Sequence, residues 1–473
     1  MILELAASLH KSSDNINQRR LGNCGQVEGT AQHPRFMVMV VTLIVVFDGE
    51  AENLWRKHFF PFPSLQDPSA PPPDGGARAW IQVLAGNLVS FITWGVVTSF
   101  GVFQTSYEEL LQLPSSTVSW IGSVQIFLLL LIGSIFAGAS LIVLGTLLSS
   151  FATQFYQFFL LQGVVVGFGM GMLYTPGVAI PTSYFESRKP FAVAVMTSGT
   201  GFGGTVFPAI FEQLLPRIGF GLTVRSMALL IFVIAVLINL MVRLRIPPRK
   251  SGPIIELDAF KDMSFSFFTV GFFLIYWSLY FAFYYMKSQR GPSTTSTNSL
   301  CKIPLYGYTY GSFTFLESSR LLFVSNALGV PGRILPGLIA SYWLGPLNTA
   351  IPSAALVSVI LFIWLVIPNE TEPLYVFAAV YGFVASAIQA LFVVSSASMS
   401  PDPSRLGTTM GMVFGIVSIA SLTGSPIGGA IIEAGGGDYT GAQLWAAISM
   451  LLGTLALIAA RISRTGWTLK LKM

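Results

Sequence analysis

Long apolar segments follow one another along most of the chain, and the short stretches between them hold nearly all the charged residues. A helix needs about 20 residues to cross the hydrocarbon core of a bilayer. Backbone that faces lipid has to be helical, because lipid offers no partner for free N–H and C=O groups. The pattern therefore predicts an all-α membrane protein with twelve spans: Ala79–Gln104, Ser119–Ala137, Leu141–Thr153, Phe155–Ile180, Phe191–Leu215, Ser226–Val242, Phe265–Met286, Leu321–Leu344, Thr349–Pro368, Leu374–Ala397, Met410–Ile432 and Leu444–Ile462.

The division between the second and third spans is the least regular part of this pattern. Residues Ser119 to Ala152 include no charge and no obvious loop. One helix of that length would be about 50 Å long, which is too long for a hydrocarbon core of about 30 Å. We therefore expect two spans, with a tight turn near Gly138–Ser140. A single span would invert the orientation of every later helix, and the later Lys and Arg residues argue against that inversion.

The central loop Arg243–Asp262 divides the spans into six and six, which is typical of transporters built from two repeated halves. The expected organisation is a largely disordered cytoplasmic tail, a six-helix half, a cytoplasmic linker, a second six-helix half with a polar insert, and a cytoplasmic C-terminal tail. Their ranges are 1–78, 79–242, 243–263, 264–462 with the insert at 287–320, and 463–473.

Lys and Arg residues decide the expected orientation, because loops rich in them stay in the cytoplasm. They gather after even-numbered spans, at 188–189, 243–261 and 461–472, although the loops after the fifth and seventh spans also contain some. Both chain ends are therefore predicted to be cytoplasmic, and the plasma membrane is the expected location. Asn369 begins a glycosylation sequon, Asn-Glu-Thr, on a predicted outer loop.

Composition excludes several classes of protein. Only 10% of the 473 residues are charged and 53% are hydrophobic, whereas soluble domains have about 25% charged residues. The net charge of +5 comes from residues beside apolar segments rather than from one basic face, so no nucleic-acid partner is expected. The two cysteines lie far apart, and all three histidines precede the first span, so no metal site or cofactor is expected either.

Four stretches carry a resemblance to a known family. They are Asp74–Trp80 at the start of the first span, Tyr184–Lys189 ahead of the glycines at Gly199–Gly204, Pro247–Pro253 in the central loop, and Pro331–Gly337 in the eighth span. Together they resemble fungal members of the monocarboxylate-porter family of the major facilitator superfamily. The resemblance implies the major facilitator fold and movement of a small organic solute by alternating access.

The chain departs from that family at its cytoplasmic loops. Family members have a Gly-Asp-Arg-rich loop between the second and third spans, which is missing here at Ser140–Leu141. The corresponding loop after the eighth span, Ser341–Gly345, has no charge, and the insert 287–320 has no counterpart. A faulty gene model and a diverged or inactive transporter both explain these differences.

Arg333 is the strongest candidate for a functional side chain. Inserting an arginine into an apolar span costs roughly 2.5–3.5 kcal/mol, and such residues usually face a cavity or a partner. The resemblance implies a role in solute binding or proton coupling, but animal relatives have an aspartate one turn earlier, where this chain has Gly329. The alternative is that Arg333 lies near the cytoplasmic end and extends to the interface.

Other candidates each have a structural alternative. Thr98 stands where animal relatives have a lysine that holds the solute carboxylate, so a simple monocarboxylate loses support. The amides Asn87, Asn326 and Gln389 either bind a polar solute or join helices by hydrogen bonds. Four aromatic residues either line a pocket or pack between helices: Tyr174, Trp277, Tyr280 and Tyr284.

The leading hypothesis is secondary transport of a small organic solute, by proton symport or by diffusion down the solute gradient. The alternative is a non-transporting membrane paralogue, similar to a sensor or receptor, that has lost the cytoplasmic gate motif. The sequence contains no HExxH, GxSxG or Walker motif and no paired aspartates within a span. Neither an enzyme nor an ATP-driven pump is therefore expected.

Overall fold

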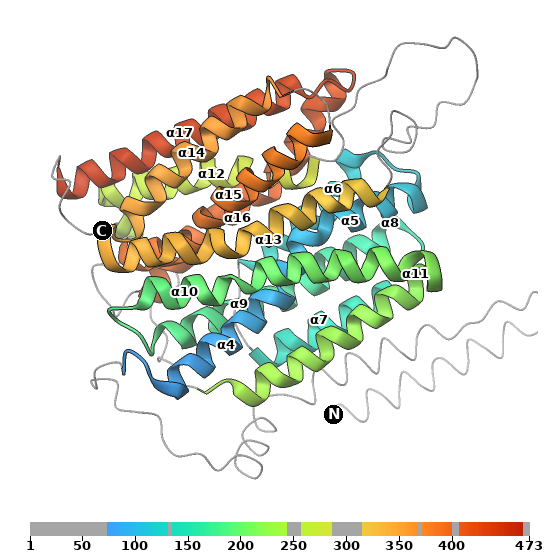
Figure 1. The fold of residues 1–473 in the computed structure, drawn as a ribbon, viewed down its shortest axis with the longest axis horizontal. Helices are drawn as coiled ribbons and strands as arrows, with labels where there is room; N and C mark the ends of the chain where they lie inside the picture. The colour runs from blue at the N-terminus through green and yellow to red at the C-terminus, as the bar shows by residue number, and fades with distance from the viewer. Residues whose placement is uncertain are drawn as a thin grey trace, which may run out of the picture. The chain divides into compact units, whose positions relative to one another are not determined.

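A computed structural model of the chain describes residues 73–130, 135–243, 257–285, 315–367, 371–399 and 406–466. All of them belong to one compact unit, Leu65–Met473. Within these ranges the chain is helical and has no strand (Figure 1). Its elements are α4 (Gly76–Ile92), α5 (Trp94–Leu111), α6 (Ser115–Leu129), α7 (Ile135–Ser149), α8 (Phe155–Phe158), η1 (Phe159–Val166), α9 (Gly167–Thr182), α10 (Lys189–Thr197), α11 (Gly199–Met241), η2 (Leu257–Lys261), α12 (Met263–Tyr285), α13 (Phe315–Ile339), η4 (Ala340–Leu344), α14 (Pro346–Trp364), α15 (Thr371–Met399), α16 (Leu406–Ala434) and α17 (Thr440–Thr465).

The predicted set of twelve spans is present in these helices. Nine helical stretches in the described ranges are long and apolar enough to cross a membrane. One of them, Lys189–Met241, contains two spans, because the backbone of α11 turns at Gly219, where φ is 74° and ψ is 170°. Two shorter apolar helices, Ser115–Leu129 and Ala137–Ser149, complete the set.

The second and third spans are separate helices, as expected, but the predicted position of the turn is wrong. Helix α6 ends at Leu129 and α7 begins at Ile135, so Gly138–Ser140 lies inside α7. Gly138 serves helix packing instead of a turn: a Cβ atom there would lie 2.6 Å from the Gly169 carbonyl oxygen of α9. Small residues allow such close approach between membrane helices.

The first six spans meet the last six along two lines of contact. Helix α6 packs against α16, and α10 and α11 pack against α13 (Figure 1). Glycines make the second contact close: a Cβ atom at Gly201 would lie 2.7 Å from the Asn326 carbonyl oxygen, and one at Gly337 would overlap the Ala194 Cβ atom. Helices in lipid associate through such packing, because lipid tails are as apolar as the helix surfaces.

The start of the first span is fastened to the loop between the fourth and fifth spans. The Asp74 N–H donates to the Tyr184 carbonyl at 3.1 Å. In return, the Asp74 carboxylate accepts from the Glu186 N–H at 2.6 Å and from the Ser187 hydroxyl at 2.8 Å. These donors, the Glu186 N–H first, hold the pKa of Asp74 below its ordinary value. Two of the stretches that carry the family resemblance are thus in direct contact.

Several predicted segments lie outside the described residues. They include residues 1–72 of the N-terminal tail, 244–256 of the linker, 287–314 of the polar insert, 467–473 of the C-terminal tail, and the sequon at Asn369. The expectations for these segments stay predictions.

Candidate functional site

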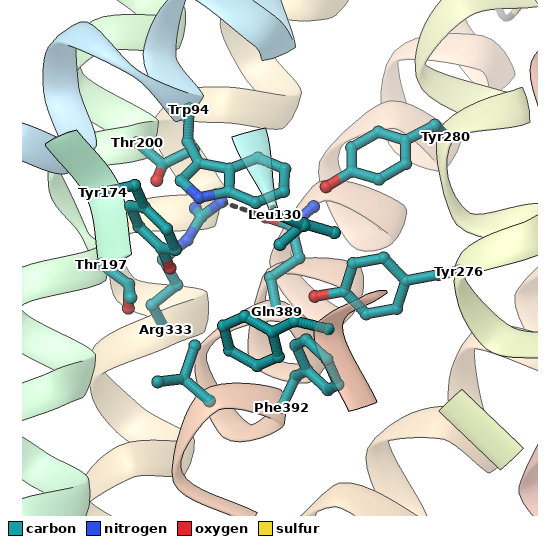
Figure 2. A pocket seen from close by; sticks show the side chains of 12 residues that line it. Trp94, Leu130, Tyr174, Thr197, Thr200, Tyr276, Tyr280, Arg333, Gln389 and Phe392 are labelled. Carbon is teal, nitrogen blue, oxygen red and sulfur yellow. Dashed lines mark hydrogen bonds between the residues drawn. The ribbon is translucent and has the colours of Figure 1, made fainter. Parts of the chain in front are cut away.

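A cavity lies between helices that belong to the two halves of the chain (Figure 2). The first half contributes residues from α5, α9, α10 and α11 and from the end of α6, and the second half contributes α12, α13, α15 and α16. Its lining residues are Trp94, Leu130, Tyr174, Thr197, Thr200, Tyr276, Tyr280, Arg333, Gln389, Phe392, Val393 and Phe414. Apart from Arg333, this lining is aromatic, aliphatic or neutral polar.

Arg333 on α13 is the charged group of this lining. Its side chain is only 1% exposed, so it does not extend to a membrane interface as the alternative required. Its Nη1 atom donates to the Gly329 carbonyl at 3.0 Å, and its Nη2 atom donates to the Gln389 Oε1 atom at 2.6 Å. The Nε atom is buried and has no partner among the residues that the structure describes. In the part of the chain that the structure describes, no carboxylate forms an ion pair with this arginine.

At Gly329, the aspartate that animal relatives of the resembled family have would force neighbouring side chains to shift. A Cβ atom at this position would lie 2.5 Å from the Ser386 Oγ atom and 2.8 Å from the Arg333 Nη1 atom. The guanidinium donates to the backbone carbonyl of residue 329, and glycine adds no side-chain acceptor to it. A neutral backbone dipole therefore takes part of the place of a charged partner.

Aromatic rings form much of the cavity wall (Figure 2). Trp94 and Tyr280 lie nearly parallel, with an interplanar angle of 10° and centroids 6.1 Å apart. Tyr174 meets Trp94 edge-on at 5.7 Å, and Tyr276 contacts Tyr280 at 6.1 Å and Phe392 at 4.8 Å. Since Trp94 and Tyr280 belong to different halves, the ring cluster joins the two halves at the cavity.

The structure brings together four of the seven predicted candidates: Arg333, Gln389, Tyr174 and Tyr280. The other three make helix contacts outside the lining. The Asn87 Nδ2 atom donates to the Val195 carbonyl at 2.8 Å, and the Asn326 Nδ2 atom donates to the Gly204 carbonyl at 3.0 Å. The Thr98 hydroxyl donates to the Gly95 carbonyl of its own helix at 3.2 Å.

Sequence reasoning missed several lining residues, above all Trp94, Tyr276 and Phe392. For Tyr276 a usable signal existed, because residues four apart share one face of a helix and Tyr280 was already a candidate. Trp277, which was a candidate, lies on a different face, where its Nε1 atom donates to the Thr423 hydroxyl at 3.0 Å. Trp94 and Phe392 are apolar residues in apolar helices, so the sequence offers no signal for them.

One hydrogen bond joins the two halves at each end of their contact. At one end, the Phe191 N–H of α10 donates to the Ser341 hydroxyl of η4 at 2.8 Å. At the other end, the Ser116 hydroxyl of α6 donates to the Glu433 carboxylate of α16 at 2.9 Å. Phe191 lies in the first turn of α10, which has no side-chain cap from its own N-terminal residue. Ser341 therefore supplies a cap from the other half.

The chain is similar to known fungal transporters over most of its length, although no protein-family model matches it. It is 35% identical to an MFS-type transporter of Gibberella zeae over 408 residues, which cover 83% of this chain and 89% of that protein. The identity is 32% with the aspyridones efflux protein apdF of Emericella nidulans, covering 84% and 81% of the two chains. It is 31% with the MFS-type transporter opdF of Penicillium oxalicum, covering 87% and 97%.

A solved structure supports the fold. The chain superposes on the human organic anion transporter MFSD10 (TETRAN) with a TM-score of 0.58 at 14% identity, covering 82% of this chain and 100% of that one. At this identity the likeness shows the fold alone, whereas the fungal relatives, at 30% identity or more over most of both chains, show the family. The chain is a multi-pass membrane protein of the major facilitator superfamily.

Proposed function

We propose that this protein is a secondary transporter that moves a small organic solute through the cavity around Arg333 by alternating access. The observation that carries the proposal is a buried arginine in a cavity lined by helices of both halves. Burying a charge is costly unless it is paired. A solute with an anionic group would offset that cost, so binding would depend directly on Arg333.

Helices from both halves allow one bound solute to affect both sides of the transporter. A ligand shifts a conformational equilibrium only through contacts that differ between the states. Solute held between Arg333 of α13 and Trp94 of α5 would make such contacts, because the two residues belong to halves that separate as the cavity opens. The Ser341–Phe191 and Ser116–Glu433 hydrogen bonds would then break in alternation.

The names of similar proteins support an organic anion as the solute and suggest that transport runs outward. One fungal relative is named an efflux protein, and the structural neighbour is named an organic anion transporter. We propose export of an organic anion across the plasma membrane, with both chain ends cytoplasmic and a glycan on Asn369. Membership of the monocarboxylate-porter family rests on the four resembling stretches and belongs to the same proposal.

Flux measurements on the purified full chain in proteoliposomes test the proposal. Uptake of labelled organic acids, including lactate, succinate, benzoate and salicylate, is compared for the unchanged protein, Arg333→Ala and Arg225→Ala. Arg225 is a matched control, because its Nε atom bonds to Ser150 at 3.2 Å and its guanidinium lies over Phe151, away from the cavity. We expect Arg333→Ala to lose at least tenfold in flux and Arg225→Ala to retain it, since hydrogen bonds to a charged group contribute about 1.5–3 kcal/mol.

Equal flux in Arg333→Ala and the unchanged protein would remove Arg333 from the mechanism. No flux of any organic acid above empty liposomes would instead favour the non-transporting paralogue, for which the missing charged loop between the second and third spans is the supporting observation. Repeating the assay with an imposed pH gradient decides the coupling. Proton symport predicts that the gradient accelerates uptake, and diffusion down the solute gradient predicts no change.

A further inference from the structure

We propose that the cavity selects flat, conjugated acids over non-planar acids of the same charge, and that Gln389 binds the acidic group together with Arg333. This inference rests on the proposed function, in that it takes the cavity as the solute site. It adds the shape of the apolar part of the solute and the second side chain that binds the charged group of the solute.

Unpaired hydrogen-bond donors of the lining indicate what the solute must present. The Arg333 Nε and Gln389 Nε2 atoms and the Tyr280 hydroxyl are buried and have no partner within the described residues. Buried polar groups in proteins are nearly always paired, so an unpaired set in one cavity requires an explanation. All three groups donate, and two of them cannot accept. A solute that satisfies them offers several acceptors close together, as a carboxylate or an enolate does.

Gln389 is oriented by its contact with Arg333. A guanidinium has five donors and no acceptor, so the amide oxygen of Gln389 must face it, as the 2.6 Å contact requires. The amide Nε2 atom then points away from the guanidinium with its hydrogens unpaired. Arg333 and Gln389 therefore form a pair of neighbouring donors, one charged and one neutral, that suits the two oxygens of one carboxylate.

The rest of the lining favours a flat and apolar solute body. Aromatic rings bind other rings through offset-stacked or edge-to-face contacts, which a saturated ring of the same size cannot reproduce. Trp94, Tyr174, Tyr276 and Tyr280 provide such rings close to the donors, and Phe392, Phe414 and Leu130 add apolar surface. A small aliphatic acid would satisfy the donors but leave this aromatic wall without contact.

Binding to the full chain in lipid nanodiscs, followed by the quenching of tryptophan fluorescence or by thermal shift, tests the inference. The probes are benzoate, cyclohexanecarboxylate, which has the same charge without the flat ring, and benzamide, which has the flat ring without the charge. We expect benzoate to bind at least about tenfold more tightly than either of the other two probes. Cyclohexanecarboxylate loses the ring contacts, and benzamide loses the charged hydrogen bonds. Equal affinity of cyclohexanecarboxylate and benzoate, or of benzamide and benzoate, would overturn the proposal.

Two variants separate the roles of the donors and the rings. Gln389→Met keeps the side-chain volume and loses the amide, so both acids should bind about tenfold more weakly while the preference for benzoate persists. Trp94→Leu should reduce that preference towards unity, whereas Trp277→Leu, an aromatic residue outside the cavity, should preserve it. The preference is a ratio within each variant, so partial unfolding leaves it unchanged. If Trp94→Leu does not fold, Tyr276→Leu carries the same expectation. An unchanged preference in the cavity variants contradicts the inference.

The failure of this inference is distinguishable from failure of the proposed function. Arg333-dependent flux of an aliphatic acid, without a preference for benzoate in binding, retains the transporter and rejects the selection of flat solutes. Selective benzoate binding without flux of any acid retains the selectivity of the cavity and rejects transport.

Discussion

At the scale of single residues, the site depends on how little space surrounds Arg333. Its charge identified this residue as a candidate from the sequence, because an arginine within an apolar span is costly and usually has a function. Its partners could not be identified in the same way. Gln389 was one of several amides, and only the fold distinguishes it from Asn87 and Asn326, which pair with backbone carbonyls of neighbouring helices. Amide side chains serve both purposes, so sequence alone cannot assign them.

Adding a methyl group beside Arg333 tests this tight fit. In Gly329→Ala the new Cβ atom would lie 2.5 Å from the Ser386 Oγ atom and 2.8 Å from the Arg333 Nη1 atom, so the guanidinium must shift. We expect organic-acid flux to fall severalfold and Ser386→Ala to restore part of it in the double variant. Gly415→Ala on α16 is the control, since nothing lies within 4 Å of its added atom. Undiminished flux in Gly329→Ala would show that transport does not depend on the exact position of the Arg333 guanidinium.

At the scale of helices, glycine has two structural roles, close helix packing and chain turning, which the sequence does not distinguish. In α7, Gly138 marks a close contact with α9, although the sequence favoured a turn there. In α11, Gly219 does mark the turn between two spans, with a positive φ of 74°. The length of the apolar segments and their lack of charge predicted the existence and type of these helices correctly. The position of a connection depends on which glycine faces another helix, and that is decided only by tertiary packing.

Ser341 and Ser116 should have opposite effects when their hydroxyls are removed. Ser341→Ala deletes the cap on α10 and frees one end of the contact between the halves, whereas Ser116→Ala frees the other end. Loss of a helix cap costs about 0.5–2 kcal/mol, which is roughly a 2- to 30-fold shift in a two-state equilibrium. We expect Ser341→Ala to increase the population of the conformation whose cavity opens at the Ser341 end. Ser116→Ala should increase the population of the conformation that opens at the Ser116 end.

Thiol labelling measures this shift. A cysteine replaces Thr197 in the cavity lining, Cys24 and Cys301 are changed to serine, and a membrane-impermeant reagent is added from each side of the membrane in turn. Faster labelling from opposite sides in the two variants supports the assignment of the two hydrogen bonds. Labelling that changes in the same direction in both variants would contradict it.

At the scale of the whole molecule, the number of spans determines where the two ends of the chain lie. The described helices provide twelve spans only because α6 and α7 are separate and α11 contains two. The sequence predicted this number through the distribution of Lys and Arg, which is a property of the loops. The cavity could not be predicted in the same way, because its lining comes from helices far apart in the chain.

An even number of spans predicts that both ends lie on the same side of the membrane. Protease protection in sealed vesicles, with one tag before Met1 and another after Met473, measures this directly. We expect both tags to be digested together when the cytoplasmic side faces outward and both to be protected when it faces inward. Digestion of only one tag would mean an odd number of spans, and it would place the error either in the pair α6 and α7 or in the division of α11.

The contact of Asp74 with Glu186 and Ser187 has a consequence for the order in which the protein is assembled. The Asp74 carboxylate and the Glu186 N–H are 112 residues apart in the chain. A ribosome that adds about 5–20 residues per second needs roughly 6–22 seconds to make that length. A first helix that enters the bilayer during this interval does so before its anchor exists. The N-terminal half therefore cannot reach its final arrangement until the loop after the fourth span has been translated.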